Sequence, residues 1–343
     1  MLPGVSRTFA LTIPQLPGAL RSVVTNAYLL CRTADTIEDE VALTPLQKEA
    51  FHDQFVAVVA GEASPEAFAS ALEPLLSDVT LPAERELVRE TAGVVALTHA
   101  YGARERAAIG RCVRIMCEGM PRFQRTTTLK GLADVHEMDR YCYYVAGVVG
   151  EMLTELFSAY SPAIEERRPV LASLATSFGQ GLQMVNIIKD MWTDRRRGVT
   201  WLPRDVFRRV GLDLETLEAG KHRDQLSAAL DEVIALAHGH LRNAFAYTIA
   251  IPPEETGIRR FLLWALGLAV LSLRKVHHNP AFLDGQTVKV SRRTVKATVL
   301  ATSLAVKHDW VLARLMQVSS AHLPLATPMT GSIHAPPFAA SAL

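Results

Sequence analysis

Two pairs of aspartates with identical spacing carry the clearest chemistry in this sequence. Asp35 and Asp39 end an apolar helical stretch near the start of the chain. Asp190 and Asp194 end another such stretch far downstream. Residues four apart share one face of a helix, so the two carboxylates of each pair repel each other unless a cation lies between them. Mg²⁺ prefers such oxygen ligands and usually also binds substrate phosphates. The pairs therefore predict a diphosphate held at the mouth of an apolar pocket.

Polar neighbours extend each aspartate pair into a longer stripe. With 35 acidic residues in a chain of 343, an isolated pair at this spacing is more often part of a solvated face than a metal site. Here the stripe is polar while the rest of its helix is apolar, which is the reverse of a solvated face. The two stripes are Tyr28, Arg32, Asp35 and Asp39, and Gln183, Asn186, Asp190 and Asp194.

A tyrosine at the head of an apolar helical face is the third informative feature. Tyr141 shares a face with Val145, and the segment 141–150 also contains Gly147 and Gly150. Each glycine weakens a helix by about 1 kcal/mol relative to alanine. Such glycines usually mark the close approach of another backbone or of a ligand. A packed core helix is the alternative interpretation of this segment.

Arginines supply candidates for binding the diphosphate itself. Arg7 lies in the segment Ser6–Phe9, and Arg32 lies on the first polar stripe. A guanidinium group can form paired hydrogen bonds with phosphate oxygens, and a salt bridge to one of the acids is the alternative for each arginine. The arginine run 195–197 directly follows the second aspartate pair. Such a run is most often solvated, but this one adjoins the predicted anion site.

Composition and motifs argue against several other classes of protein. The net charge of +1 does not fit a general nucleic-acid binder, so we expect no nucleic-acid partner. The sequence contains no Walker motif, no complete G-x-G-x-x-G, no G-x-S-x-G and no H-E-x-x-H. The four cysteines form no C-x-x-C pair, which fits reduced thiols in a cytoplasmic protein. The first residues lack an apolar signal core, so we do not expect secretion.

Helical periodicity dominates the chain and predicts one all-α domain over residues 1–318. The longest apolar run, 261–273, would span about 20 Å as a helix, short of the roughly 30 Å core of a bilayer, and predicts a buried helix. The composition of 319–343 predicts a poorly ordered tail. The expected helices are 17–39, 45–60, 65–76, 82–98, 102–118, 130–139, 141–160, 165–193, 204–209, 213–219, 222–248, 256–278 and 290–317.

Taken together, these segments resemble the squalene/phytoene synthase family. The similarity covers roughly residues 5–317 and includes Trp201-Leu-Pro203 after four segments in family order, which are 6–9, 28–39, 141–150 and 183–194. It implies an all-α isoprenoid synthase fold, a helical bundle around a central cavity. It also implies head-to-head condensation of two farnesyl diphosphates to presqualene diphosphate and then squalene. The implied cofactors are Mg²⁺, with Mn²⁺ as an alternative ion, and NADPH.

The resemblance also implies roles for individual residues. Catalytic roles would fall to Tyr141, Tyr28, Arg7 and Arg32, with Tyr141 handling a proton or stabilising a cation. The implied metal ligands are Asp35, Asp39, Asn186, Asp190 and Asp194. The implied substrate contacts are Ser6, Phe9, Val145, Val149, Leu153, Gln183, Asn186, Lys189 and Phe261. Lys189 stands where an arginine is common, which keeps the charge but loses the guanidinium fork.

The same resemblance bears on the apolar wall and on the reductant. Carbocations need a dry cavity, so Val148 and Met152 are further candidates for its wall. The segment 282–293 resembles the basic stretch near the reductant in the family members that form squalene. Lys289 and Arg292 are the implied NADPH contacts, and Ser291 stands where a second basic residue is usual.

The resemblance leaves the final product open. Family members that stop at presqualene diphosphate, or that form dehydrosqualene or phytoene, share both aspartate motifs. A non-catalytic binding or assembly protein would be expected to lose metal aspartates, and head-to-tail chain-elongating enzymes normally carry adjacent aspartates. We expect a cytoplasmic monomer that binds farnesyl diphosphate. Because its substrate and product are apolar, we also expect peripheral contact with a membrane surface.

Overall fold

The chain folds almost entirely into helices. The computed structural model describes residues 1–6, 8–126 and 128–328. Within these residues the one strand-like pairing is an isolated β-bridge between Leu132 and Pro203. The prediction of an all-α fold is therefore confirmed.

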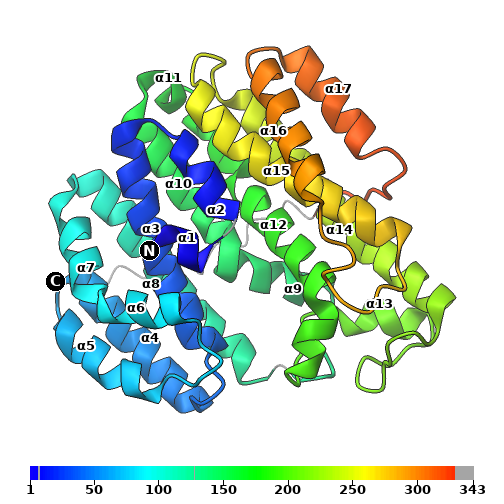
Figure 1. Ribbon diagram of the computed structural model, residues 1–343, viewed down its shortest axis with the longest axis horizontal. Helices are drawn as coiled ribbons and strands as arrows, with labels where there is room; N and C mark the ends of the chain where they lie inside the picture. Colours follow the sequence, from blue (N-terminus) through cyan, green and yellow to red (C-terminus); the bar gives the residue numbers. More distant parts are fainter. Residues whose placement is uncertain (7, 127, 329–343) are drawn as a thin grey trace.

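The first part of the chain forms a group of helices on one side of the molecule (Figure 1). Local sequence explains several of its boundaries. Thr44 accepts a hydrogen bond from the backbone N–H of Gln47 at 3.3 Å and starts α4 with a capping box. Gly61 ends α4 with φ of 82°, a conformation that suits glycine. The helices of this group are α1 Leu2–Val5, α2 Thr8–Thr12, η1 Ile13–Gln15, α3 Gly18–Asp39, α4 Pro45–Ala60, α5 Pro65–Leu72, η2 Glu73–Leu75, α6 Pro82–Arg89, α7 Thr91–Ala100 and α8 Ala103–Gln124.

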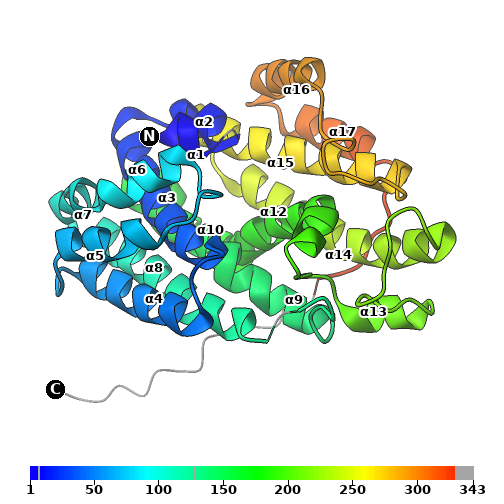
Figure 2. The same cartoon turned by 60° about the horizontal axis from the view of Figure 1, so that its bottom comes forward.

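The second part of the chain forms the opposite side of the molecule and the centre. α10 joins the two groups, because it packs against α3 and α8 on one side and against α12 on the other. Figure 2 shows α16 and α17 at the outer edge, beyond α15. These helices are α9 Val135–Cys142, the π-helical turn η3 Tyr143–Gly147, α10 Val148–Tyr160, α11 Pro162–Glu165, α12 Arg168–Arg196, α13 Arg204–Arg209, α14 Arg223–Ala250, α15 Thr256–His278, α16 Arg292–Ala305 and α17 Asp309–Ser319.

Glycines let the central helices approach each other closely. A β-carbon at Gly150 would lie 2.0 Å from the carbonyl oxygen of Ala175, and one at Gly179 would lie 1.9 Å from that of Ala146. No side chain fits at such distances, so the backbones of α10 and η3 lie directly against that of α12. At Gly150, the close approach expected from the sequence is that of another backbone.

α15 is an apolar helix at the centre of the second group. By length and composition it is the one described helix that could cross a membrane. In this structure 61% of its apolar stretch is buried inside the protein, where it packs against α12, α14 and α16. Phe261 and Leu273 are both buried, in agreement with the helix predicted for this run.

Several of the predicted helices differ from the observed ones. The helix predicted over 130–139 begins only at Val135, and the one predicted over 141–160 is interrupted by η3. The helix predicted over 102–118 continues to Gln124, and the one predicted over 65–76 ends in the short turn η2. The predicted helix 82–98 is divided at Glu90 into α6 and α7. The segment 213–219 forms turns rather than a helix. The predicted helix 290–317 starts later and is divided into α16 and α17.

A buried arginine explains the last of these divisions. Arg259 of α15 is 0% exposed. Its guanidinium donates to the carbonyl oxygens of Ile251 and Val306 at 2.8 and 2.9 Å and to the carboxylate of Asp309 at 2.7 Å. Val306 and Asp309 flank the turn between α16 and α17. The helix ends there because its carbonyl and its next acid bind a cation that lies about fifty residues earlier in the sequence.

The tail predicted from residue 319 is described as far as Pro328. Leu323 is buried, and the backbone N–H of Ala326 donates to the carbonyl oxygen of Ala235 in α14 at 3.0 Å. The chain up to Pro328 therefore lies along α14, which differs from the expectation for that part. Residues 329–343 lie outside the described residues, and the expectation for them stays a prediction.

Candidate active site

One large cavity of about 1180 Å³ lies between α3, α10, α12 and α15. Residues of α2 and of the segment before α16 also line it. Apart from the wall candidate Val148, every predicted site residue that the structure describes lines this cavity, although these residues are far apart in the sequence. They are Ser6, Phe9, Tyr28, Arg32, Asp35, Asp39, Tyr141, Val145, Val149, Leu153, Gln183, Asn186, Lys189, Asp190, Asp194, Phe261, Lys289 and Arg292. Arg7 lies outside the described residues.

On the α3 side, the cation of the polar stripe already has an acidic partner. Arg32 donates through Nε to Oε1 of Glu84 at 3.1 Å, and its Nη1 lies 3.6 Å from a carboxylate oxygen of Asp35. Glu84 is buried in α6. The alternative that the sequence left open, a salt bridge to an acid, is therefore realised for Arg32. Its guanidinium still lines the cavity.

A third acid on α3, Glu38, also lines the cavity, and sequence reasoning missed it. The side chain is 7% exposed, and its Oε1 has no hydrogen-bond partner among the described residues. Burial, together with Asp39 and Asp35, raises the pKa of Glu38 well above its usual range. Its position three residues after Asp35, nearly on the same helix face, was the available signal.

On the α12 side, a lysine lies beside the second aspartate pair. Nζ of Lys189 lies 3.1 Å from a carboxylate oxygen of Asp190 and donates to Oδ1 of Asn186 at 3.3 Å. Of the three-arginine run, only Arg197 lines the cavity, and its guanidinium lies 3.8 Å from Asp39 across from it. Arg197 therefore links the two acidic helices.

The acids of the two helices repel one another. Burial, with a contribution from Asp39 and against the effect of Arg32, raises the pKa of Asp35 to about 7. Burial, then Asp190 and Asp39, raises the pKa of Asp194 to about 7. Both shifts mean that negative charge is disfavoured here without a further cation.

These residues fit a divalent ion such as Mg²⁺. Among the described residues, no group of three or more His, Cys, Asp or Glu side chains is already close enough together to hold one ion. The donor set is nevertheless suitable, because two carboxylate pairs and an amide oxygen line one cavity. The unpartnered oxygen of Glu38 and the mutual repulsion of the acids point to the same requirement for positive charge.

The ring of Tyr141 stacks on an indole. The rings of Tyr141 and Trp201 are parallel within 3° with centroids 4.0 Å apart, and Phe123 packs edge-on against Tyr141 at 5.4 Å. Burial and the nearby acids Glu38 and Asp39 raise the pKa of Tyr141 well above its usual range. The hydroxyl therefore stays protonated at neutral pH, and both residues of the stacked pair line the cavity.

Apolar and aromatic side chains form the remaining wall. The Phe9 ring lies 5.0 Å from that of Tyr28 and 6.5 Å from that of Phe261. Of the two further wall candidates, Met152 lines the cavity, whereas Val148 is buried in the core and lies outside the lining. The apolar residues of the lining include Ile13, Val24, Met116, Phe178, Leu182, Ile187, Ala265 and Leu268.

Two cations lie where the cavity meets the segment before α16. Nζ of Lys289 donates to Oε1 of Gln286 at 3.4 Å. Both Lys289 and Arg292 line the cavity. Ser291 caps α16, since its hydroxyl accepts from the backbone N–H of Thr294 at 3.2 Å. The two cations fit phosphate groups, and the cap explains why a serine stands between them.

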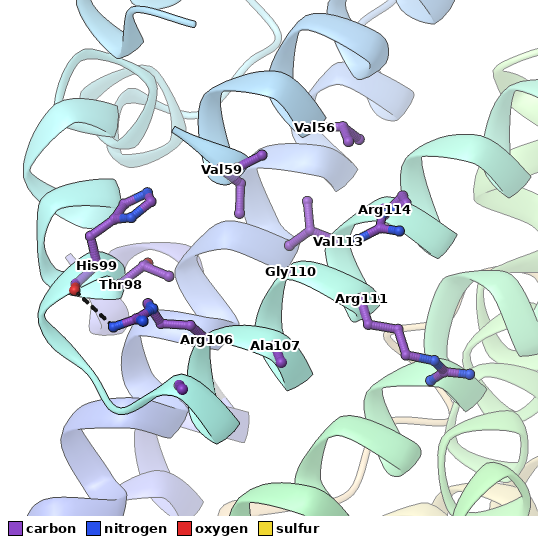
Figure 3. Close-up of a pocket in the computed structure, with 12 residues that line it drawn as sticks. Val56, Val59, Thr98, His99, Arg106, Ala107, Gly110, Arg111, Val113 and Arg114 are labelled. Atoms are coloured by element: carbon purple, nitrogen blue, oxygen red, sulfur yellow. Dashed lines mark hydrogen bonds between the residues drawn. The ribbon is translucent and has the colours of Figure 1, made fainter. Parts of the chain in front are cut away.

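A second cavity, of about 380 Å³, lies away from all of these residues (Figure 3). It lies among α4, α7 and α8 and contains Arg106, whose guanidinium donates to the carbonyl oxygen of His99 at 3.4 Å. None of the predicted site residues lines it. The chemistry therefore belongs to the larger cavity.

Comparison with known proteins agrees with this arrangement. A model of the squalene/phytoene synthase family matches residues 2–294. A squalene synthase of Cochliobolus lunatus is 25% identical over 308 residues, which cover 88% of this chain and 70% of that protein. The squalene synthase of Rattus norvegicus is 28% identical over 296 residues, covering 85% and 65%. The chain thus spans about two thirds of the length of these relatives. A solved structure of TcSQS with a ligand has the same fold, with a TM-score of 0.70 and 22% identity over 92% of this chain and 86% of that one.

Proposed function

Because the chain belongs to the squalene/phytoene synthase family, it is a prenyltransferase, and we propose that it condenses two farnesyl diphosphates head to head. Presqualene diphosphate is then the first product and squalene the second. The observation that carries this proposal is the meeting of both aspartate pairs in one cavity whose other walls are apolar and aromatic. Such a cavity can take the charged diphosphate beside the acids and the apolar chain along the rest.

In the proposed first step, the bond between the allylic carbon and the diphosphate oxygen of one substrate breaks. A double bond of the second substrate forms a carbon–carbon bond with the resulting cation, and loss of a proton to an oxygen of the released diphosphate closes the cyclopropane. Mg²⁺ held by the two aspartate pairs and Asn186 would stabilise the charge of the departing diphosphate. Lys189, Arg32 and Arg197, all part of the lining, would orient the same group.

Tyr141 is the proposed partner of the carbon cation. Its ring and that of Trp201 stack and can stabilise positive charge through their faces. Since burial keeps the hydroxyl protonated, it would act in this proposal as a neutral O–H that relays the departing proton to the released diphosphate, not as a phenolate base. The apolar walls exclude water that would otherwise capture the cation.

The second half of the reaction needs a reductant. NADPH would supply a hydride as the second diphosphate leaves, and Lys289 and Arg292 would bind its phosphates. The basic pair supports a phosphate-bearing cofactor. The serine cap between the two cations favours an alternative, in which the reductant is held weakly and the reaction ends at presqualene diphosphate or dehydrosqualene.

Product analysis tests the proposal directly. The protein is incubated with farnesyl diphosphate and Mg²⁺, with and without NADPH. We expect squalene only with NADPH and presqualene diphosphate without it. Dehydrosqualene or presqualene diphosphate regardless of NADPH would replace the first proposal with the alternative, and phytoene from a longer substrate would change the substrate assignment.

The cellular setting is part of the same proposal. We propose a cytoplasmic monomer in peripheral contact with a membrane. The four cysteines are free and buried, which supports a reducing compartment. The apolar substrate chains and product support contact with a membrane.

A further inference from the structure

A stripe of basic and apolar side chains follows the outer face of α16. Arg293, Lys296, Leu300 and Leu304 lie three or four residues apart, so they share one helix face. All four are exposed. Lys307 comes just after the helix and Trp310 lies in the first turn of α17, and both are exposed. We call these six residues the α16 stripe.

The apolar members of the α16 stripe are far more exposed than is usual for their types. Leu300 is 62% exposed, Leu304 73% and Trp310 76%. α16 packs only against α15 and α17 among the helices with substantial contact, and Figure 2 shows it at the outer edge of the molecule. Three large apolar side chains on one outer edge indicate a surface that meets a partner.

The charges of the stripe define the partner. Arg293 and Lys296 precede the two leucines, and Lys307 follows them. Within α16 every charged residue is basic, and the first acid beyond it, Asp309, is paired with the buried Arg259. A surface that combines leucines, tryptophan and uncompensated cations is typical of proteins that lie on an anionic membrane.

A second copy of this chain fits less well. In a symmetric dimer the same patch meets itself, so Lys296 and Lys307 of one copy would face the cations of the other. Anionic headgroups would instead neutralise them, while the tryptophan and leucines enter the boundary between headgroups and acyl chains.

The stripe also adjoins the catalytic cavity. Arg292 and Val295, in the first turn of α16, line that cavity, and the exposed leucines lie two turns further along the same helix. A membrane held by the stripe would therefore lie near the part of the cavity that the first turn of α16 lines.

We propose that the α16 stripe is the surface through which this protein docks on an anionic lipid bilayer. The inference deepens the proposed function, since it names the membrane-facing side of that cavity, but the exposed residues carry it independently of the product. Docking needs no conversion of substrate. Its test is therefore separate from product analysis.

Vesicle sedimentation with the full chain tests the proposal. The vesicles contain phosphatidylcholine alone or with phosphatidylglycerol, and no substrate is present. We expect binding to the anionic vesicles that weakens with salt. The variant L300Q/L304Q and the variant K296E/K307E should each lower the partition coefficient by about tenfold or more. The matched control is Leu46→Gln, because Leu46 in α4 is 74% exposed.

Tryptophan emission supplies a second readout. Trp310 is the most exposed tryptophan, whereas Trp192 and Trp264 are buried. Anionic vesicles should shift the emission to shorter wavelength in the parent protein and not in Trp310→Phe. Equal vesicle binding by parent, stripe variants and control would overturn the proposal. The proposal would also be overturned if the parent does not bind vesicles but forms a dimer, seen by light scattering, that the substitutions L300Q/L304Q dissociate. The stripe would then bind a second copy of the chain.

If the variants keep farnesyl diphosphate turnover in solution but lose vesicle binding, docking and catalysis are separate properties of the chain. If the parent protein binds vesicles but does not convert farnesyl diphosphate, the result would contradict the proposed function and leave the docking surface in place.

Discussion

The two acidic helices of the cavity have the same aspartate spacing but different surroundings. On α3 the pair is accompanied by a third acid, Glu38, and by Arg32, which is fixed by a buried glutamate of α6. On α12 the pair is accompanied by Lys189, which binds its own neighbours Asp190 and Asn186. The α3 side therefore has three acids beside one arginine that a further acid binds, while the α12 side has two acids and a lysine that binds residues of its own polar stripe.

The two helices also differ in what lies behind them. A histidine of α4, His52, lies behind α3, with Nε2 3.2 Å from the carbonyl oxygen of Ala34. Behind α12, His240 of α14 lies 3.1 Å from Asp139 and 3.2 Å from Ser177. One helix is thus supported by a neutral hydrogen bond and the other by a buried polar cluster. The same aspartate spacing therefore occurs on two helices whose packing partners differ.

The largest expected effect comes from removing one acid on either side. Asp35→Asn and Asp190→Asn should each lower turnover of farnesyl diphosphate by about a thousandfold, because each removes a carboxylate from the predicted metal site. Helical content, measured by circular dichroism, should stay unchanged. Asp53→Asn, at an exposed position of α4, is the control. Full turnover in either variant would contradict the metal assignment.

The next largest effect is expected at Tyr141, which lines the same cavity as the two aspartate pairs. Tyr141→Phe should lower formation of presqualene diphosphate by about a hundredfold, because the hydroxyl is lost while the stack on Trp201 is kept. The matched control is Tyr144→Phe, since Tyr144 lies on the same helical segment and outside the cavity lining. Unchanged output from Tyr141→Phe would remove the hydroxyl from the mechanism.

The third prediction concerns His52 and acid. Burial lowers the pKa of His52 to about 4, so between pH 6.5 and 4 the unfolded chain binds a proton that the folded chain excludes. Stability falls as pH drops through this window, by about 2 kcal/mol at pH 5 from His52 alone. Urea unfolding at pH 7 and pH 5 should show a smaller loss for His52→Gln than for the parent.

The exposed His99 provides the control for that measurement, since His99→Gln should keep the full loss. An equal loss in the His52 variant and the parent would show that other groups cause the acid sensitivity.

The smallest expected effect tests the difference in charge between the α3 side and the α12 side of the cavity. Glu38→Gln should raise the Mg²⁺ concentration for half-maximal activity by about tenfold, because a cation bound nearby would favour the ionised form of the third acid of α3 and gain its charge. Glu62→Gln, at an exposed turn, serves as the control. An unchanged Mg²⁺ requirement would mean that the two aspartate pairs suffice.

Sequence predicted the helices well where periodicity and local signals agree. α3 and α4 follow capping and turn residues, and the predicted bounds match the observed ones within a residue. The division after α16 was missed because it depends on Arg259, a buried residue of another helix. No local sequence pattern predicts a contact between two helices that are so far apart in the chain.

The same distinction holds for the site. Residues chosen from spacing and family resemblance line one cavity, because helical faces follow directly from sequence. The partners of those residues do not follow in the same way: Glu84 fixes Arg32 from α6, and Trp201 stacks on Tyr141 from a loop. Both contacts join segments far apart in the chain, and only the packing of helices creates them.

The π-helical turn Tyr143–Gly147 makes the orientation of the Tyr141 side chain depend on the number of residues in this segment. Such a turn contains one residue more than an α-helical turn. A single deletion there, for example of Ala146, would let α9 and α10 continue as one regular helix. Each residue of an α-helix turns by about 100°, so the deletion would rotate Tyr141 away from Trp201. Insertions and deletions in this segment should therefore be tolerated less well than substitutions that keep its length.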